Sequence, residues 1–344
     1  MLTGKGNKGD LDLKILFETS TDSEVSCYRI PALITANNGN LIVAADERVP
    51  SCQDLRTNDN INIVIRVSSD NGKSWSKPST VIDFPSGQSA SDPSFILNKY
   101  TGKIFLFYNY MDLIHEKSVY YFHYVESTDN GLTWTQPKDI TQFVSTDKRK
   151  YDFQFVTSGR GTQTNDGWLL HTLVSLKYGI FVFGSKDHGE TWFFNPEPLA
   201  PADESQIIGL NNGSWFISSR VNKLGYRYTH LSADKGKSWT SNIDSTLVDP
   251  SCNAGLIQYE YKGKSCLLMT NATSKYKREN LCLHISVDQG KTWKQVLQLY
   301  AGSGAYSSVS QLKNGDLGVV FEKDDYTEIA YMKIPKKIIM NYLK

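Results

Sequence analysis

Side chains that could do chemistry are concentrated in a few short polar segments of this 344-residue sequence. One reads Cys-Tyr-Arg-Ile-Pro at 27–31, another reads ADERVPSCQDLRTNDN at 45–60, and a third reads GSGAYSSVSQL at 302–312. Arginine binds carboxylates and phosphates through charge-assisted, often bidentate hydrogen bonds, and carboxylates transfer protons to and from reacting groups. The chemistry open to these segments is therefore anion binding combined with proton transfer.

Metal chemistry and disulfide formation find little support in the spacing of the ligand-type residues. The six histidines show no HExxH or similar pattern. The cysteines are odd in number and no pair has CxxC spacing, so neither a zinc site nor a disulfide framework is expected. We expect no metal and no organic cofactor, and we expect small buried residues at the five cysteine positions. These are Cys27, Cys52, Cys252, Cys266 and Cys282.

The overall charge argues against large polyanions as partners. A net charge of +1 and a pI near 7.6 create no strong field for nucleic acid or an anionic membrane, so any anion-binding site must be local. No apolar run reaches the length of a membrane span. Residues 1–14 are polar and lack the apolar core of a signal peptide, which fits either a cytoplasmic protein or one whose signal has been removed.

One octapeptide of the form S-x-D-x-G-x-[ST]-W, here called the box, recurs along the chain. Its five copies begin at Ser68, Ser127, Ser185, Ser232 and Ser286. Strand-like segments precede the copies, such as NINIVIRV at 60–67. The Asp bonds to nearby backbone, the Gly takes a positive φ and the Trp covers the turn, so each box marks one hairpin. We expect the box residues to be structural and not catalytic.

The spacing of the boxes predicts the fold class. A repeat of roughly 50 residues is typical of solenoids, propellers and arrays. Because the segments between boxes alternate with period two, we expect an all-β fold, a six-bladed β-propeller of four-stranded antiparallel blades. No linker or low-complexity tract interrupts residues 1–344, so a single domain is expected. Residues 333–344 are expected to form a short helix that closes the ring.

Together with the five boxes, the Tyr-Arg-Ile-Pro motif resembles the sialidase family of glycoside hydrolases over essentially the whole chain. Sialic acid carries a carboxylate on its anomeric carbon, and the resemblance implies a clamp of three guanidinium groups for it. The resemblance assigns Arg29, Arg220 in GSWFISSRV and Arg278 in SKYKREN to this clamp. Arg227 and Lys277 are near neighbours that compete with the last two assignments.

The resemblance also implies a tyrosine nucleophile, Tyr306. An anionic nucleophile would meet the carboxylate of the substrate, whereas a neutral tyrosine activated by a carboxylate base avoids that repulsion. Glu204 in PADESQ matches the base, and Asp203 is its nearest competitor. Glu322 in VVFEKDD resembles a carboxylate that braces Arg29 as a structural support of the site.

The acid/base of the family is an aspartate on a loop after the opening strands. Asp54 matches best when counted forward from Arg29, whereas counting back from the first box keeps Asp59 as an alternative. Arg48 and Asp92 resemble family residues that contact the 4-hydroxyl of the sugar, and their register supports Asp54.

The expected function is that of a retaining exo-sialidase. Such an enzyme removes terminal α-linked sialic acid from glycoproteins, glycolipids and oligosaccharides through a covalent sialyl-tyrosine. A trans-sialidase or an intramolecular trans-sialidase would use the same residues, and a non-catalytic propeller that binds sialylated glycans is the alternative from another class. We expect a monomer that is secreted or at the cell surface, with no nucleic-acid partner. Arg160 in GRGTQT is expected to be structural.

Overall fold

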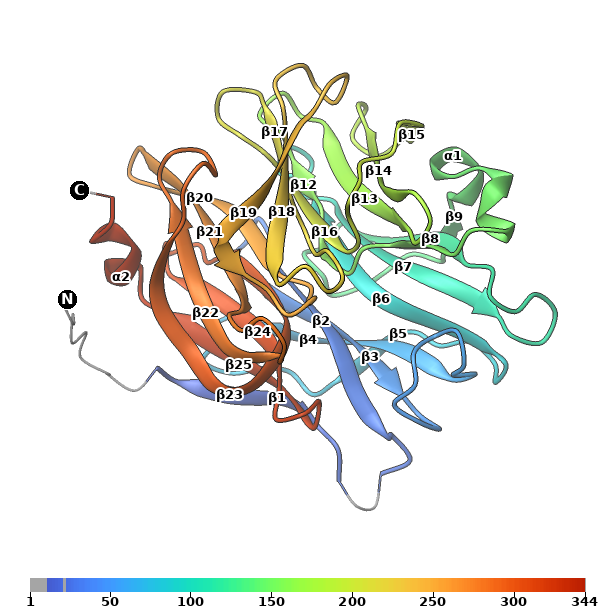
Figure 1. The fold of residues 1–344 in the computed structure, drawn as a ribbon. Coiled ribbons are helices and arrows are strands. Elements are labelled where there is room, and N and C mark those ends of the chain that lie inside the picture. Colours follow the sequence, from blue (N-terminus) through green and yellow to red (C-terminus); the bar gives the residue numbers. More distant parts are fainter. Residues whose placement is uncertain (1–10, 21–22, 344) are drawn as a thin grey trace.

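The structure is built almost entirely from β-strands. The computed structural model describes residues 11–20 and 23–343, shown as a ribbon in Figure 1. Within those residues the helical elements are α1 (Thr141–Val144), the 3-10 turn η1 (Asp147–Lys150) and α2 (Lys336–Met340). The predicted all-β class is confirmed. No helix in the described part is long and apolar enough to cross a membrane. The first ten residues of the polar N-terminal segment lie outside the described residues.

Four sheets follow one another along the first three quarters of the chain. The first contains β2 (Cys27–Thr35), β3 (Leu41–Arg48), β4 (Ile61–Ser68) and β5 (Ser79–Ile82). The second contains β6 (Gln88–Leu97), β7 (Ile104–Asp112), β8 (Tyr121–Ser127), β9 (Lys138–Asp139) and β11 (Gly159–Arg160). The third contains β10 (Gln154–Val156), β12 (Thr162–Gln163), β13 (Leu169–Ser175), β14 (Gly179–Ser185) and β15 (Phe193–Phe194). The fourth contains β16 (Ser205–Gly209), β17 (Trp215–Ser219), β18 (Tyr226–Ser232) and β19 (Thr240–Val248).

A fifth sheet of seven strands completes the structure. It contains β20 (Gly255–Tyr261), β21 (Lys264–Ala272), β22 (Glu279–Ser286), β23 (Lys294–Gln311), β24 (Leu317–Lys323), β25 (Glu328–Ile334) and β1 (Leu13–Glu18). The 18-residue β23 pairs with β22 up to Ser303 and with β24 from Gly304 onward. The C-terminal helix forms as α2, but the edge of β25 that faces away from β24 pairs with β1 from the start of the chain.

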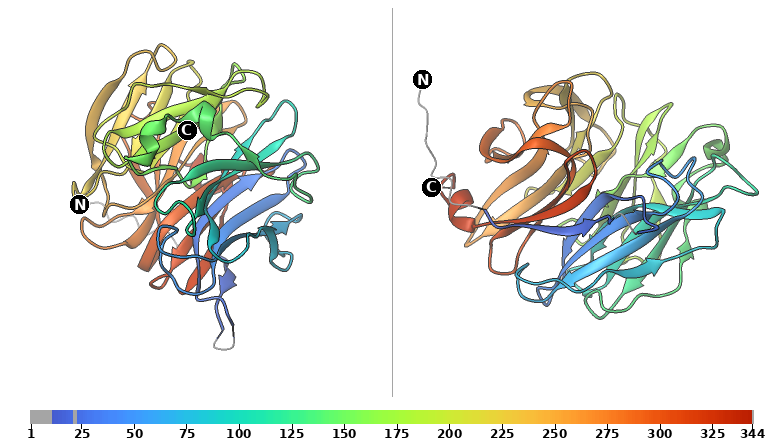
Figure 2. Two further views of the ribbon diagram at one scale, coloured as in Figure 1. Left: turned by 90° about the vertical axis from the view of Figure 1, so that its right-hand side faces the viewer. Right: turned by 90° about the horizontal axis from the view of Figure 1, so that it is seen from below.

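Apolar clusters lie between successive sheets. One cluster joins Ile42 of the first sheet to Phe95 of the second, and others connect the later pairs of sheets in turn. A further cluster joins Val43 of the first sheet to Val320 on β24. In Figure 1 the colours pass around the molecule from blue through green and yellow to red, and Figure 2 shows the same succession from two other sides. The last sheet therefore returns to the first.

Each box forms the turn between two successive strands of one sheet, namely β4 and β5, β8 and β9, β14 and β15, β18 and β19, or β22 and β23. In the box that begins at Ser185, the Ser185 hydroxyl donates to Asp187 at 2.8 Å and accepts from the Gly189 N–H at 2.8 Å. The Thr191 hydroxyl donates to the other oxygen of Asp187 at 2.5 Å. The four other boxes repeat this pattern. The box carboxylates thus hold turns, as expected.

Gly189 of the third box also lies against a neighbouring sheet, which leads to a prediction about stability. Gly189 has φ +94°, and a Cβ there would come within 2.2 Å of the buried Phe105 ring on β7. We expect Gly189→Ala to lower the free energy of unfolding by about 3 kcal/mol, through backbone strain and overpacking. Urea denaturation measures this loss.

Gly213→Ala is the matched control for this prediction. Gly213 has φ +84°, but a Cβ there would meet nothing within 4 Å. The control should therefore cost only the backbone strain, about 1 kcal/mol. Equal losses in the two variants would show that the contact between the box and the preceding sheet does not stabilise the fold.

Candidate active site

Three residues named from the sequence meet at one phenolic oxygen. Glu204 directly precedes β16 and Arg220 directly follows β17, so the pairing of these two strands places them side by side. Tyr306 lies on β23, and its hydroxyl donates to Glu204 Oε2 at 2.5 Å. Arg220 Nη1 donates to the Tyr306 oxygen at 2.9 Å and also to Glu204 Oε2. A tyrosine, a carboxylate and a guanidinium thus form a closed triangle of hydrogen bonds.

Burial decides the charge state of the tyrosine in this triangle. Tyr306 and Glu204 are 8% and 4% exposed. Burial and the Glu204 charge raise the pKa of Tyr306 well above its ordinary value, while Arg220 and Arg278 oppose the shift. Burial also raises the pKa of Glu204, again against the pull of Arg220. The tyrosine therefore holds its proton, and the carboxylate beside it has an increased affinity for one.

Glu322 on β24 ties Arg29 to the strand that carries Tyr306. Its two oxygens accept from Arg29 Nε at 2.9 Å and Arg29 Nη2 at 3.3 Å. The same carboxylate accepts from the backbone N–H of Ile30 at 2.9 Å and from that of Tyr306 at 3.1 Å. Ile30 has φ +57°, where the pairing of β2 with β3 is interrupted. Glu322 thus positions both the Arg29 guanidinium and the backbone of Tyr306.

Arg278 approaches the same tyrosine from another side. It lies just before β22, and its Cζ is 5.1 Å from the centroid of the Tyr306 ring. The Arg29 Cζ is 5.7 Å from that centroid. Arg278 donates to the Ser251 carbonyl at 3.0 Å and to the Tyr326 hydroxyl at 3.2 Å. The structure therefore brings all three predicted clamp arginines around Tyr306.

Asp54 lies on the loop after β3, within reach of two arginines. Its Oδ1 is 2.8 Å from Arg48 Nη1 and 3.6 Å from Arg29 Nη1. Desolvation of the carboxylate would raise the pKa of Asp54, but the charge and hydrogen bond of Arg48 and the charge of Arg29 outweigh it and lower that pKa. The Asp54 side chain is 76% exposed, so it is open to a ligand.

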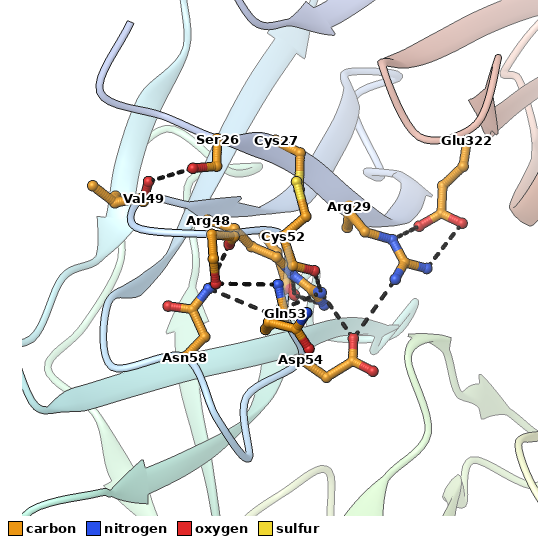
Figure 3. The surroundings of a disulfide bond; sticks show 12 residues. Ser26, Cys27, Arg29, Arg48, Val49, Cys52, Gln53, Asp54, Asn58 and Glu322 are labelled. Atoms are coloured by element: carbon orange, nitrogen blue, oxygen red, sulfur yellow. Dashed lines mark hydrogen bonds and ion pairs between the residues drawn. A yellow bond between two sulfur atoms is a disulfide. The ribbon is translucent and has the colours of Figure 1, made fainter.

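A disulfide joins this loop to β2, where the sequence analysis expects none. Cys27 lies two residues before Arg29, Cys52 lies two residues before Asp54, and their Cα atoms are 5.6 Å apart (Figure 3). That expectation is wrong for this pair because the pairing of Cys27 with Arg48 across β2 and β3 creates the proximity, and sequence spacing does not report it. The other three cysteines are free and buried, as predicted.

Asp92 and Arg48 are linked by a residue that the sequence analysis missed. Asp46 is buried, and its Oδ2 accepts from Arg48 Nη2 at 2.9 Å. Its Oδ1 accepts from the Asp92 N–H at 3.0 Å, and Asp92 itself has φ +62°. Burial and the charges of Asp46 and Glu204 raise the pKa of Asp92 well above its ordinary value. Positions two apart on a strand share a face, so Asp46 was recognisable from Arg48.

The competing residues lie in different settings. Arg227 is fully buried, pairs with Asp249 at 3.0 Å and donates to the Cys252 carbonyl at 2.8 Å. Lys277 is exposed. Asp59 is exposed on the Asp54 loop, and its carbonyl accepts from the Gly87 N–H.

Asp203 and Arg160, which the sequence also singled out, lie in two different places. Asp203 borders the triangle, since its Oδ2 lies 3.8 Å from Arg220 Nε. Arg160 donates to the Val309 carbonyl at 2.9 Å and lines a separate cavity of about 390 Å³ together with Lys99 and Gln258. That cavity contains none of the residues around Tyr306.

No cluster of three or more metal-ligating side chains occurs among the described residues. The arrangement offers instead a neutral phenol beside a carboxylate, an exposed second carboxylate and several guanidinium groups. These groups can bind an anion and transfer protons next to a nucleophilic oxygen.

Comparison with known proteins identifies a matching domain family and several relatives of this chain. The profile of the BNR repeat-like domain matches residues 31–319. The sialidase of Bacteroides fragilis is 28% identical over 90% of this chain and 62% of its own length. The sialidase of Micromonospora viridifaciens is 29% identical over 86% of this chain and 50% of its own length. The chain thus spans about half to two thirds of the length of these curated relatives.

Solved structures agree on the fold. A Hadza microbial sialidase superposes with a TM-score of 0.84 at 25% identity, covering 93% of this chain and 68% of that chain. The intramolecular trans-sialidase from Ruminococcus gnavus, in complex with oseltamivir carboxylate, superposes with a TM-score of 0.79 at 18% identity, covering 94% and 97%. At that identity the second likeness concerns the fold alone. By its matched domain, its relatives and its structural neighbours, the chain belongs to the sialidase family of BNR repeat-like proteins.

Proposed function

We propose that this chain is a retaining exo-sialidase that hydrolyses terminal α-linked sialic acid from glycoproteins, glycolipids and oligosaccharides. The contact between the Tyr306 hydroxyl and Glu204, surrounded by three arginines, carries the proposal. A substrate with a carboxylate on the reacting carbon suits a neutral nucleophile in a cationic setting. Sialidase relatives over most of the chain support the same substrate class.

The fold proposed for this enzyme is a single six-bladed β-propeller domain. Four sheets would each make one blade, and the seven-stranded sheet would supply two, with β23 crossing from the fifth blade into the sixth. The sixth blade would then contain β24, β25 and, as its outer strand, β1. Contacts of β2 with both β6 and β23 support closure of the ring.

In the proposed complex, Arg29, Arg220 and Arg278 bind the substrate carboxylate. Because all three surround Tyr306, a carboxylate held between them brings the anomeric carbon close to the phenolic oxygen. Arg48 and Asp92 would bind the 4-hydroxyl of the sugar. The clamp therefore provides both affinity and alignment for the attack.

In the first step, the Tyr306 oxygen forms a bond to carbon 2 while the bond from carbon 2 to the leaving oxygen breaks. Glu204 accepts the phenolic proton, and Asp54 donates its proton to the leaving oxygen. In the second step, Asp54 removes a proton from water, the water oxygen bonds to carbon 2, and Tyr306 leaves and recovers its proton from Glu204. Two inversions retain the configuration.

Asp54 must carry a proton for the first step, and the free protein holds its pKa low. A substrate carboxylate bound at Arg29 would offset the positive charge that stabilises ionised Asp54. Substrate binding would therefore raise the pKa of Asp54 and favour its protonated form in the complex.

We also propose that the protein is a monomer that works outside the cell or at its surface. The disulfide between Cys27 and Cys52 supports the proposed location, because disulfides persist in oxidising compartments and are rare in the cytosol. Free thiols at both positions, in protein recovered from its native cells, would contradict this location.

The nucleophile is tested by Tyr306→Phe, with Tyr151→Phe as control because Tyr151 is 92% exposed. We expect the wild type and the control to release sialic acid from sialyllactose. We expect Tyr306→Phe to lose roughly 10³-fold or more in kcat, because no oxygen remains to attack. Full turnover by Tyr306→Phe would refute the assignment, and an inactive, folded wild type would favour the binding-propeller alternative. Free sialic acid as product separates hydrolysis from transfer.

The acid/base is tested by Asp54→Asn against Asp59→Asn on the same loop. A general acid contributes about 10²–10⁴-fold when the leaving group is poor. Asp54→Asn should therefore slow the cleavage of sialyllactose by that factor and the formation of the intermediate from an aryl sialoside much less. The two substrates are compared by kcat/KM. A larger loss in Asp59→Asn would transfer the role to Asp59.

The base is tested by the pH dependence of kcat, which reports the substrate complex in which Asp54 is proposed to carry its proton. Glu204 must be ionised to accept the proton, and burial raises its pKa above the ordinary 4.5. Activity should therefore be lost as the pH falls through a value above 4.5. The Asp203 charge raises that pKa further, so Asp203→Asn should move the acid limb to lower pH. A limb that stays in place in Asp203→Asn would argue against Glu204 as the titrating base.

A further inference from the structure

The three arginines around Tyr306 differ in how their charges are balanced. Arg29 pairs with Glu322 and Asp54, and Arg220 pairs with Glu204 and Asp203. Arg278 forms no ion pair within the part of the chain that the structure describes. It is therefore the clamp arginine whose charge is least neutralised by the protein, and it needs some other group to fix its position.

Tyr326 supplies such a group. Its hydroxyl accepts a hydrogen bond from Arg278 Nη1 at 3.2 Å. The face of its ring lies against Arg29, whose Cζ is 4.2 Å from the ring centroid. One side chain thus touches two of the three clamp arginines, through a hydrogen bond to the first and a cation–π contact to the second.

The hairpin that carries Tyr326 is held in an unusual conformation. The turn between β24 and β25 places Asp324, Asp325 and Tyr326 at φ +49°, +54° and +71°, in the left-handed region that costs energy for residues other than glycine. Ser303 on β23 fixes the turn, because its carbonyl accepts from the Asp324 N–H at 2.9 Å and its hydroxyl donates to Asp325 at 2.7 Å. Such conformations persist where the surroundings determine them, often at functional sites.

We propose that Tyr326 is a positioning residue that holds Arg278 and Arg29 at the spacing needed to bind the substrate carboxylate. The inference rests on the proposed sialidase function. A neutral phenol orients Arg278 without neutralising its charge, whereas a carboxylate in that place would compete with the carboxylate of the substrate. Tyr326 lies outside every motif that resembles the family, so sequence reasoning had no signal for it.

The two contacts can be separated by substitution. Tyr326→Phe removes the hydroxyl that holds Arg278 and keeps the ring against Arg29, so KM should rise about fivefold. Tyr326→Leu removes both contacts, so KM should rise roughly 20-fold. Arg29 keeps its bond to Glu322 and Arg220 its bond to Tyr306 in both variants, so the carboxylate stays aligned by these two arginines and kcat should stay nearly constant.

The experiment measures kcat and KM for sialyllactose in the wild type, the two Tyr326 variants and Tyr276→Phe. Tyr276 lies two residues before Arg278 and is 90% exposed, so its variant should match the wild type. Calorimetric binding of 2-deoxy-2,3-didehydro-N-acetylneuraminic acid should weaken by the same factors. Its methyl ester, which lacks the charge, should bind weakly and equally to all four proteins.

The measurements distinguish a failure of the Tyr326 positioning role from a failure of the proposed sialidase function. An active wild type with unchanged KM and inhibitor affinity in Tyr326→Leu would overturn the positioning role and leave the sialidase assignment intact. A loss confined to kcat would also overturn it, because it would indicate a role in the chemical step. A folded wild type that neither hydrolyses sialyllactose nor binds the inhibitor would overturn both.

Discussion

The geometry of the site depends on the hydrogen bonds that the Glu322 carboxylate accepts. It binds the Arg29 guanidinium and the backbone N–H groups of Ile30 and Tyr306, so it joins β2 near the start of the chain to β23 near its end. Glu322 is 1% exposed, and an unpaired carboxylate at that depth would be costly. Removing it would leave the arginine without its main partner and the Tyr306 N–H without its bond to the carboxylate.

Around this anchor, opposite charges are placed so that the tyrosine stays neutral while its neighbours are charged. Arg220 stabilises the ionised form of Glu204 and would stabilise a developing phenolate at Tyr306. The second carboxylate, Asp54, is held by Arg48 on a loop that a disulfide attaches to β2 (Figure 3). The site thus combines a buried tyrosine–carboxylate pair with an exposed second carboxylate, a division that suits the proposed reaction, which needs both attack and protonation.

Local sequence patterns predict the all-β class and the positions of the box turns. The boxes predict turns from bonds that an Asp makes within four residues, and β4 begins within one residue of the strand expected at 60–67. The residues that the resemblance assigns to the clamp, the nucleophile and the base are far apart in the sequence, and the structure brings them together around Tyr306. What the sequence could not supply depends on pairing between distant segments. The disulfide needs β2 beside β3, and the contact of Tyr326 with Arg278 needs a specific hairpin conformation.

The central claim is that Tyr306 becomes covalently bound to the sugar. Incubation with 2,3-difluorosialic acid would slow breakdown of the intermediate, since fluorine at carbon 3 destabilises a positively charged transition state, while the fluoride leaves readily. Mass spectrometry of the digested protein should then show one added fluorosialosyl group on the peptide that contains Tyr306. An added mass on Glu204 or Asp54, or an enzyme that turns over substrate but forms no adduct at Tyr306, would contradict the account.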